Sequence, residues 1–352
     1  MHPVLDVAAS ALAIDLSNLA EAAARTDQRL SVVRAEARQY LELAGLGTAH
    51  QFDIVAFGSI ARQEMSPGSD FDWLVIARRF SEDPDDFVHY RRAAVSAMEA
   101  LGLEPPGASG LFGTVIGGTE LVNTIGLDND TNLHHSRRIL VLEESVSLLE
   151  PDRHRELRKA ITARYLHDQV NQPGKAPRFL LNDVVRYWRT VAVDYQAKRW
   201  QELEGRKWGL RLLKLRSSRK LTFAGTLASL LTPAIANTTT NVNGLVDAWE
   251  MPPLARLAAW HEFVTGDARR ALADVLVLAD QFMGWLATED IRRAAEQVAH
   301  PREAAVGSQL HDVYEATHAL QDALLRLFSS SEPVNGNPEA SIGEIASRYL
   351  LF

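Results

Sequence analysis

Two aspartates separated by one residue lie where a polar turn gives way to an apolar run. Asp70 and Asp72 occur in the segment SDFDWLVIA. If this segment is extended, side chains two positions apart share one face of a strand. Adjacent carboxylates repel each other unless one is protonated or a cation lies between them. Because Mg²⁺ and Mn²⁺ bind one or two carboxylates together with substrate phosphates, the pair predicts a site for one of these metals.

Gly58 and Ser59, which follow the preceding apolar run, have the residue types of a phosphate-binding turn. A glycine after a strand lets the backbone approach a ligand closely. The free N–H groups at the start of a helical turn attract an anion, and the Ser59 hydroxyl adds a donor. A phosphate-binding turn beside a metal pair is what phosphoryl or nucleotidyl transfer requires.

The ordered set of residues in this segment resembles the signature of the DNA-polymerase-β-like nucleotidyltransferase superfamily. Its middle part resembles the bacterial branch that includes the PII-protein uridylyltransferases and the minimal nucleotidyltransferases. By that resemblance, a nucleoside triphosphate (NTP) is the substrate, its phosphates rest on the glycine and the serine, and the two aspartates hold the metals. The residues that carry the likeness are Gly58-Ser59, Ala61-Arg62, Glu64, Ser69-Asp70 and Asp72.

A third carboxylate from a later strand usually completes the site in this superfamily and helps to activate the acceptor hydroxyl. Glu120 in GTELVNTIG is the residue that we expect in this role, and Asp128 and Asp130 in GLDNDTN are the alternatives. None of the three lies in a clean apolar strand. Arg62 and Glu64 are interpreted as structural, pairing locally or anchoring the short helix.

A basic run in the second half of the chain is the other candidate for ligand binding. Lys207, Arg211 and Lys214 are spaced to share one helix face, and GLRLLKLRSSRKL contains no acidic residue. The face is either a solvated helix surface or a contact for a triphosphate or a nucleic-acid acceptor. In the second case, Lys214 and Lys207 are the preferred residues.

The elements that must position these residues follow from apolar periodicity. Residues 52–57 and 72–77 predict strands with a short helical turn between them, and a third strand is expected near LFGTVIG. Helices are expected in 4–45, from Pro84 to a stop at Gly102, and after DNDTN. The last of these is expected to run through Ile139, Leu142, Val146 and Leu149. From about residue 155 to the end, the periodic segments are expected to be helical, and ANTTTNVNG and SSSEPVNGNPEAS are expected to be loops.

The predicted fold class is α+β, with a small nucleotidyltransferase-type mixed sheet and flanking helices, followed by a large all-helical domain. The expected division is an N-terminal helical segment at 1–47, the nucleotidyltransferase-like domain at 48–150 and the helical domain at 151–352. The length of 352 residues supports two or three domains.

Composition narrows the class of protein. The absence of cysteine excludes disulfides and thiolate metal sites, and a net charge of −8 argues against strong non-specific nucleic-acid binding by the whole chain. No secretory signal or membrane span is expected, so a cytoplasmic protein is predicted. The resemblance to the bacterial branch implies that the protein is bacterial.

Three functions remain open from the sequence. The first is a metal-dependent nucleotidyltransferase that moves a nucleoside monophosphate from an NTP such as ATP to an unknown acceptor, with release of pyrophosphate. The acceptor is a protein, an RNA or a small molecule. The second is a catalytically silent nucleotide-binding regulatory module, and the third is a nucleotidyltransferase toxin or defence effector.

Overall fold

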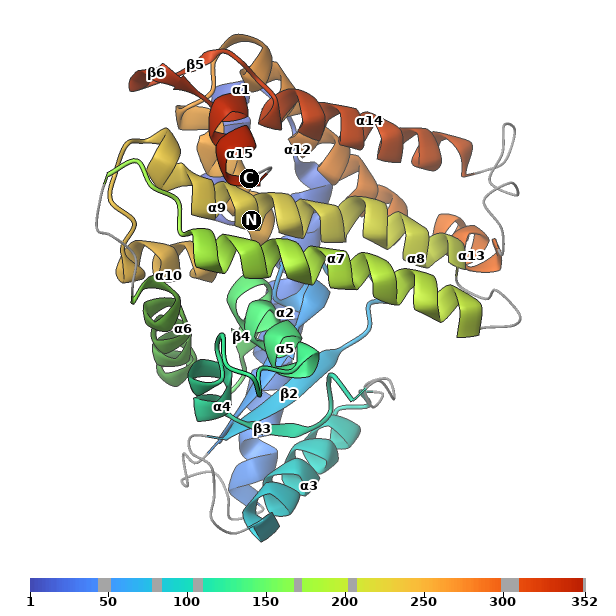
Figure 1. The fold of residues 1–352 in the computed structure, drawn as a ribbon. Coiled ribbons are helices and arrows are strands. Elements are labelled where there is room, and N and C mark those ends of the chain that lie inside the picture. The colour runs from blue at the N-terminus through green and yellow to red at the C-terminus, as the bar shows by residue number, and fades with distance from the viewer. Residues whose placement is uncertain are drawn as a thin grey trace. The chain divides into compact units, whose positions relative to one another are not determined.

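The computed structural model forms two compact units (Figure 1). The first unit comprises Met1–Ala22, Val170–Asn241 and Pro253–Phe352, and the second comprises Ala23–Gln169 and Val242–Pro252. The predicted domain boundaries at 47/48 and 150/151 stay a prediction. The structure describes residues 1–43, 52–77, 84–103, 110–167, 173–201, 208–298 and 310–350, without the side chains of 84–87 and 198–201.

The second unit contains a mixed sheet of four strands in the order β3-β2-β1-β4. Strands β1 (Phe52–Phe57) and β2 (Asp72–Ala77) are antiparallel, and both have the bounds predicted from the sequence. Strand β3 (Val115–Gly117) runs parallel to β2 and lies within the segment predicted as a third strand. Strand β4 (Ser145–Ser147) is antiparallel to β1.

Strand β4 corrects one expectation. The helix after DNDTN, α5 (Asn132–Glu143), does not continue through Val146 and Leu149. The chain instead becomes extended, and Val146 pairs with Ala56 in β1. Backbone groups at the edge of β1 need hydrogen-bond partners when they are buried, and this non-local pairing supplies them. Thr131 caps the start of α5, because its hydroxyl accepts a hydrogen bond from the His134 N–H.

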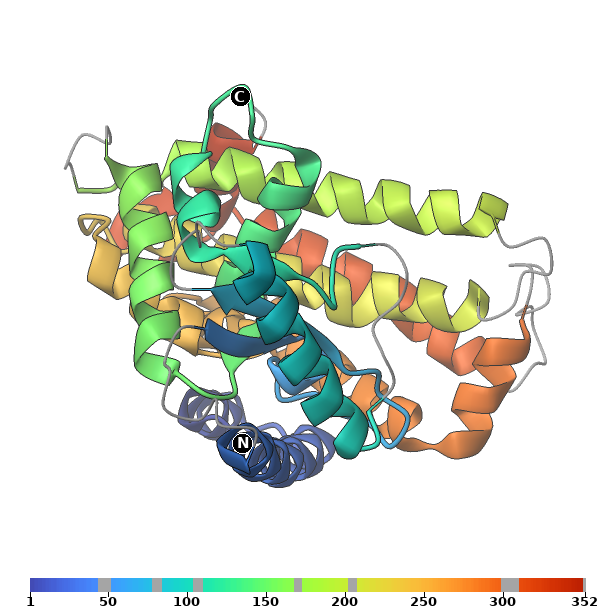
Figure 2. The ribbon, with the colours of Figure 1, turned by 90° about the horizontal axis from the view of Figure 1, so that it is seen from below.

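One face of the sheet carries a hydrophobic core. Alternate residues of β1 and β2 point into it, and helices α2 (Ser17–Leu43) and α3 (Pro84–Ala100) close it (Figure 2). Helix α3 starts at the proline that the sequence indicated, and Gly102 follows its end with a φ of 65°. The members of this cluster include Ile54, Ala56, Phe71, Trp73, Val75, Val33, Ala37, Ala94, Ala97 and Met98.

Three further helices complete the second unit. They are α4 (Gly118–Asn123), α6 (Pro151–Leu166) and α10 (Val242–Glu250). Helix α10 is distant in sequence but contacts α6, where the Trp249 indole N–H donates to the Thr162 hydroxyl at 3.3 Å. Sequence proximity therefore does not define this unit.

The first unit is almost entirely helical. Its long helices α7 (Arg178–Gln201), α9 (Lys220–Ile235), α12 (Gly266–Ala287) and α14 (His311–Phe328) lie side by side in Figure 1. A two-stranded ribbon of β5 and β6 forms within the segment SSSEPVNGNPEAS, which was expected to be a loop. The remaining elements are α1 (Pro3–Leu12), α8 (Trp208–Lys214), η2 (Leu215–Arg219), α11 (Pro253–Ala258), η3 (Ala259–Glu262), α13 (Glu289–Gln297), β5 (Pro333–Val334), β6 (Asn337–Ser341) and α15 (Ile342–Leu350).

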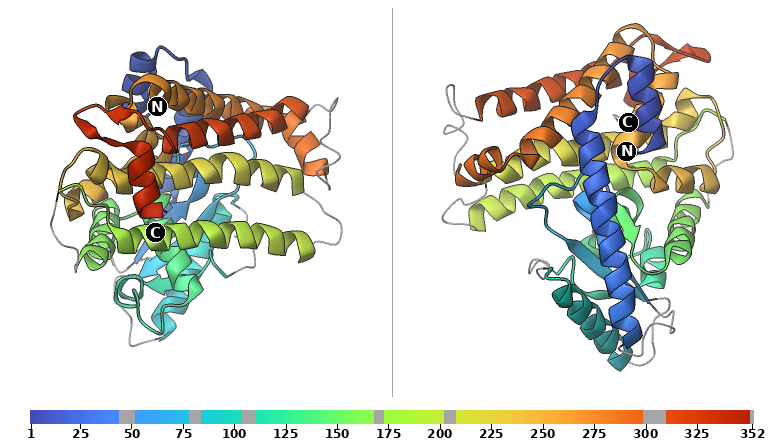
Figure 3. Two further views of the ribbon diagram at one scale, coloured as in Figure 1. Left: turned by 45° about the horizontal axis from the view of Figure 1, so that its top comes forward. Right: turned by 180° about the vertical axis from the view of Figure 1, so that it is seen from behind.

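Helix α2 is one continuous helix, as the rear view in Figure 3 shows. The break in the N-terminal helical region follows α1, at Ala13, whose φ of 55° is left-handed. Among the described helices, none alone has the length and apolarity to cross a bilayer; α12 and α13 pass that test only as a pair bent by 85°.

Candidate active site

The end of β1 and the start of β2 bring the two halves of the sequence motif together. Phe57 pairs with Asp72 in the antiparallel register, so Gly58, the next residue, lies at the same edge of the sheet as Asp72. Gly58 has a φ of 74°, a left-handed conformation that glycine adopts at little cost. The chain then forms the helical turn η1 (Gly58–Ile60), which leaves Ser59 partly exposed.

Asp72 lies on the face of the sheet opposite the hydrophobic core. Its neighbour Trp73 is buried in the core cluster, and residues alternate between faces in a strand. Asp72 is the first residue of β2 and is partly exposed, whereas Asp70 lies two positions before it, outside the strand, and is exposed. Both aspartates are therefore near the start of β2.

The turn after Gly58 folds back tightly on itself. The Arg62 N–H donates to the Gly58 carbonyl at 3.0 Å, and the Glu64 N–H donates to the Ser59 carbonyl at 2.8 Å. Gln63 closes the turn with a φ of 60°, which is uncommon for a residue with a Cβ. These bonds give the Gly58–Ser59 segment a fixed shape.

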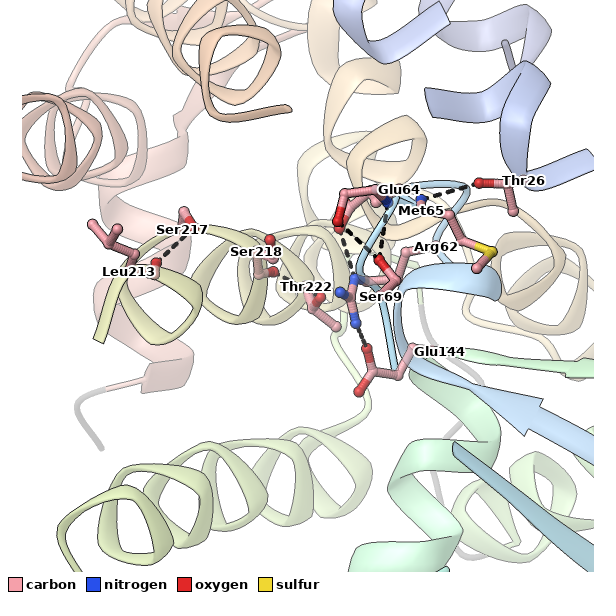
Figure 4. A network of polar contacts seen from close by, with 11 residues as sticks. Thr26, Arg62, Glu64, Met65, Ser69, Glu144, Leu213, Ser217, Ser218 and Thr222 are labelled. Atoms are coloured by element: carbon pink, nitrogen blue, oxygen red, sulfur yellow. Dashed lines mark hydrogen bonds and ion pairs between the residues drawn. The ribbon is translucent and has the colours of Figure 1, made fainter. Parts of the chain in front are cut away.

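A buried ion-pair network lies over this turn (Figure 4). The Arg62 Nε atom is 2.8 Å from Glu64 Oε2, and Arg62 Nη1 pairs with Glu144. Burial by itself lowers the pKa of Arg62, but the two carboxylates outweigh it and the pKa is raised. Burial raises the pKa of Glu64, against the attraction of Arg62. The predicted structural pairing of Arg62 with Glu64 is therefore present, with a second partner.

Glu144 is a residue at this sheet edge that the sequence analysis missed. It directly precedes Ser145, which pairs with Phe57. The signal was weak: two consecutive glutamates end the apolar stretch RRILVLEE, and they were read as part of a longer helix. Only the pairing of β4 with β1 brings Glu144 next to the Gly58 turn.

The fold does not bring Glu120 to the edge where Asp72 lies. Strands β2 and β3 run parallel, so both leave that edge together, and Gly117 pairs with Ala77. Five residues of strand carry β2 about 16 Å from Asp72 to Ala77. Glu120 belongs to α4, which begins directly after Gly117.

The alternative acids are also placed elsewhere. Asp130 forms two hydrogen bonds with Arg138, at 3.1 and 2.7 Å. Burial works to raise the pKa of Asp130, but the Arg138 guanidinium outweighs it and the pKa is lowered. Asp128 is exposed in the loop between α4 and α5. The structure therefore groups neither acid with Asp70 and Asp72.

Aromatic and basic groups lie beside the start of β2, in the segment that leads into β3. The segment beside the start of β2 is held by the Gly113 N–H, which donates to the Trp73 carbonyl at 2.8 Å. Phe112 in this segment packs its ring 5.5 Å from that of Phe57. Arg137 from α5 donates to the Gly110 carbonyl at 2.6 Å and to the Thr114 hydroxyl at 2.8 Å. Residues 110–117 contain no acid.

The basic run belongs to the first unit. Lys207 lies outside the described residues, and Lys214 is the partly exposed last residue of α8. The next turn, η2, is a π-helix, in which the hydroxyl of Ser217 donates to the Leu213 carbonyl at 2.7 Å (Figure 4). Burial, with a smaller contribution from Arg216, lowers the pKa of Lys220 to about 8.

The carboxylates present fit a metal that is shared with a substrate. In the described part of the chain, no group of three or more His, Asp or Glu side chains is arranged to hold a metal ion. Mg²⁺ is commonly bound by one or two carboxylates plus substrate phosphates, so a pair of aspartates suffices for such a shared site. Asp70 and Asp72 are the residues that would hold it.

Comparison with known families agrees with this geometry. Residues 43–152 match the family model described as the nucleotidyltransferase domain. The chain therefore contains a nucleotidyltransferase domain, consistent with the polymerase-β-like superfamily, and such a domain supports nucleotidyl transfer in general. Neither a curated protein nor a solved structure matches the chain.

Proposed function

We propose that this protein is a metal-dependent nucleotidyltransferase that transfers a nucleoside monophosphate from an NTP to an acceptor hydroxyl. The single observation that supports it most is the shared sheet edge of the Gly58–Ser59 turn and the Asp70–Asp72 pair. This edge lies within the segment that matches the nucleotidyltransferase domain. The acceptor is a protein, an RNA or a small molecule.

In the proposed reaction, the Gly58–Ser59 turn binds the triphosphate through backbone N–H groups and the Ser59 hydroxyl. Asp70 and Asp72 hold Mg²⁺ or Mn²⁺, which supplies positive charge for the phosphates when bound. The acceptor oxygen bonds to the α-phosphorus while the bond from that phosphorus to the bridging oxygen breaks. Pyrophosphate leaves with that oxygen, and the proton of the acceptor hydroxyl passes to solvent water.

The proposed site leaves out Glu120, because the fold places it beyond the opposite end of β2. Proton removal from the acceptor is not assigned to a carboxylate of the β3 region. Lys214 stays a predicted phosphate contact, and the toxin or defence-effector role stays a prediction without a further observation to favour it.

The second candidate function is a nucleotide-binding regulatory module without turnover. One observation favours it: Phe112 and Arg137 hold the segment beside the start of β2, and residues 110–117 contain no acid. Two aspartates can bind a metal–NTP complex, but in the described part of the chain no third carboxylate is grouped with them to activate an acceptor.

Calorimetric titration tests the shared part of both proposals. Each NTP is titrated with Mg²⁺ into the wild type, into Asp72→Asn and into Asp152→Asn. The last variant is a matched control, because Asp152 is an exposed acid in the first turn of α6. We expect metal-dependent binding in the wild type and control, and a loss of at least about tenfold in Asp72→Asn. Equal binding by all three proteins would refute the site.

Labelled NTP then separates the two candidates. The protein is incubated with α-labelled NTP and Mg²⁺ together with itself, total RNA or total protein as acceptor. Label transfer with pyrophosphate release, lost in Asp72→Asn, supports the transferase. Tight binding without transfer to any of these acceptors favours the silent module.

A further inference from the structure

The buried network of Arg62, Glu64 and Glu144 connects three parts of the proposed site. Arg62 and Glu64 belong to the turn that follows β1, and Glu144 directly precedes β4. All three side chains are nearly inaccessible, with exposed fractions of 10%, 7% and 6%. The network thus joins the turn to the neighbouring strand of the sheet from inside the protein.

The guanidinium lies beside the glycine that begins the turn. A Cβ atom placed on Gly58 would have Arg62 Nη1 as its nearest neighbour, at 3.9 Å. Gln63, which lies between Arg62 and Glu64 in the sequence, has a left-handed φ. This bend of the backbone allows the Glu64 carboxylate to accept a hydrogen bond from Arg62. A strained residue at this point indicates that surrounding contacts determine the shape of the turn.

The far end of the same loop is fixed separately. The Met65 N–H donates to the Thr26 hydroxyl of α2 at 3.1 Å (Figure 4). Arg25 donates to the Met65 carbonyl at 2.8 Å. The Ser66 N–H donates to the Ser69 hydroxyl at 2.9 Å, directly before Asp70. Helix α2 therefore holds the part that leads to Asp70, and the Arg62 network holds the part that contains Gly58 and Ser59.

We infer that Arg62, held between Glu64 and Glu144, is the positioning residue that fixes the Gly58–Ser59 turn against the sheet for triphosphate binding. This inference rests on the proposed function of the turn. Arg62 acts through the backbone of the turn, because its Nε and Nη1 atoms already bind two carboxylates. A planar guanidinium can bind both at once, whereas a lysine ammonium cannot reproduce that fork.

The test compares two Arg→Lys variants in the second unit. Arg62→Lys removes the fork from the turn. Arg138→Lys is the matched control, because Arg138 is also buried and pairs with a carboxylate, Asp130, outside the turn. Both variants are expected to unfold at a lower temperature than the wild type. Only Arg62→Lys is expected to weaken metal-dependent NTP binding, by about 10- to 100-fold. This is the usual loss when a residue that orients the ligand-binding groups, without binding the ligand itself, is replaced.

The two carboxylates give a second, internal test. Glu64→Gln and Glu144→Gln each leave the guanidinium one charged partner and an acceptor oxygen, so each is expected to weaken NTP binding by less than about threefold. The double variant leaves a buried cation without a carboxylate and is expected to weaken binding as much as Arg62→Lys. Purely additive effects would contradict a shared clamp.

Hydrogen exchange decides the inference even if nucleotide binding fails. The amides of Ala61 and Glu64, which donate to the Gly58 and Ser59 carbonyls, should exchange faster in Arg62→Lys than in the wild type, and should be unchanged in Arg138→Lys. If the wild type binds no NTP, the proposed function fails and exchange alone tests the positioning role. If the wild type binds NTP and Arg62→Lys binds it equally, with unchanged exchange in the turn, the inference is wrong.

Discussion

Asp53 makes the stability of the second unit dependent on pH. Its side chain is 6% exposed on β1, and burial is the largest effect on its pKa, which is raised from 3.8 to about 6. Hydrogen bonds from the backbone of Leu149 and Glu150 to Oδ1, at 3.1 and 3.3 Å, oppose the shift without cancelling it. Oδ2 is buried and has no hydrogen-bond partner among the described residues.

The direction and size of the effect follow from the raised pKa. The stabilising contribution of the neutral carboxyl is complete below pH 3.8 and is lost as the pH rises through 6. A shift of about two units corresponds to about 3 kcal/mol in the free energy of unfolding. At neutral pH, the ionised Asp53 therefore destabilises the fold by about that amount relative to its neutral form.

Asp53→Asn removes the titration and keeps Oδ1 as an acceptor. The new amide donates from the position of Oδ2, where a missing partner costs about 1–3 kcal/mol. Below pH 4 the variant should therefore be less stable than the wild type by that amount. At pH 7 the two effects nearly offset, so the variant should be equal to the wild type or up to about 2 kcal/mol more stable.

Urea unfolding of both proteins between pH 4 and 8 measures this difference. His154 changes the absolute curves in the opposite sense, since burial, Arg158 and Arg34 lower its pKa and its contribution is lost as the pH falls below 6.5. The difference between wild type and variant cancels that effect. Hydrogen exchange in β1 and β4 assigns the change to the second unit. A difference that stays constant across this pH range would refute the raised pKa of Asp53.

Two further predictions concern packing in the first unit. In Gly225→Ala, the added Cβ would lie 1.9 Å from the Pro253 carbonyl oxygen, so α9 and α11 must separate; we expect a loss of about 3 kcal/mol or more in urea unfolding. Asp280 of α12 accepts hydrogen bonds from the Leu19 N–H at 2.8 Å and the Asn18 amide at 2.7 Å, near the start of α2. Asp280→Ala should cost about 1–2 kcal/mol and shorten α2 by circular dichroism, and unchanged stability would contradict the cap.

The strands and the turn between them could be predicted because their signals are local. The residues FDIVAF and DWLVIA are apolar, β-rich and bounded by turn residues, and the observed strands have those bounds. Proline and glycine likewise marked the ends of α3. Which strands pair with each other could not be predicted from local signals, because the pairing of Ser145 with Phe57 joins residues far apart in the sequence.

The difference between local and non-local signals also explains which site residues could be predicted from the sequence to lie close together. Gly58, Ser59, Asp70 and Asp72 flank one antiparallel pair, so their spacing along the chain almost determines their proximity in space. Glu120 was chosen by residue type in a later segment, where the direction of the strand decides the outcome. Because β3 runs parallel to β2, an acid after β3 leaves the site edge, whereas an acid before β4, which is antiparallel to β1, arrives at it. Glu144 meets that second condition, and its carboxylate forms an ion pair with Arg62.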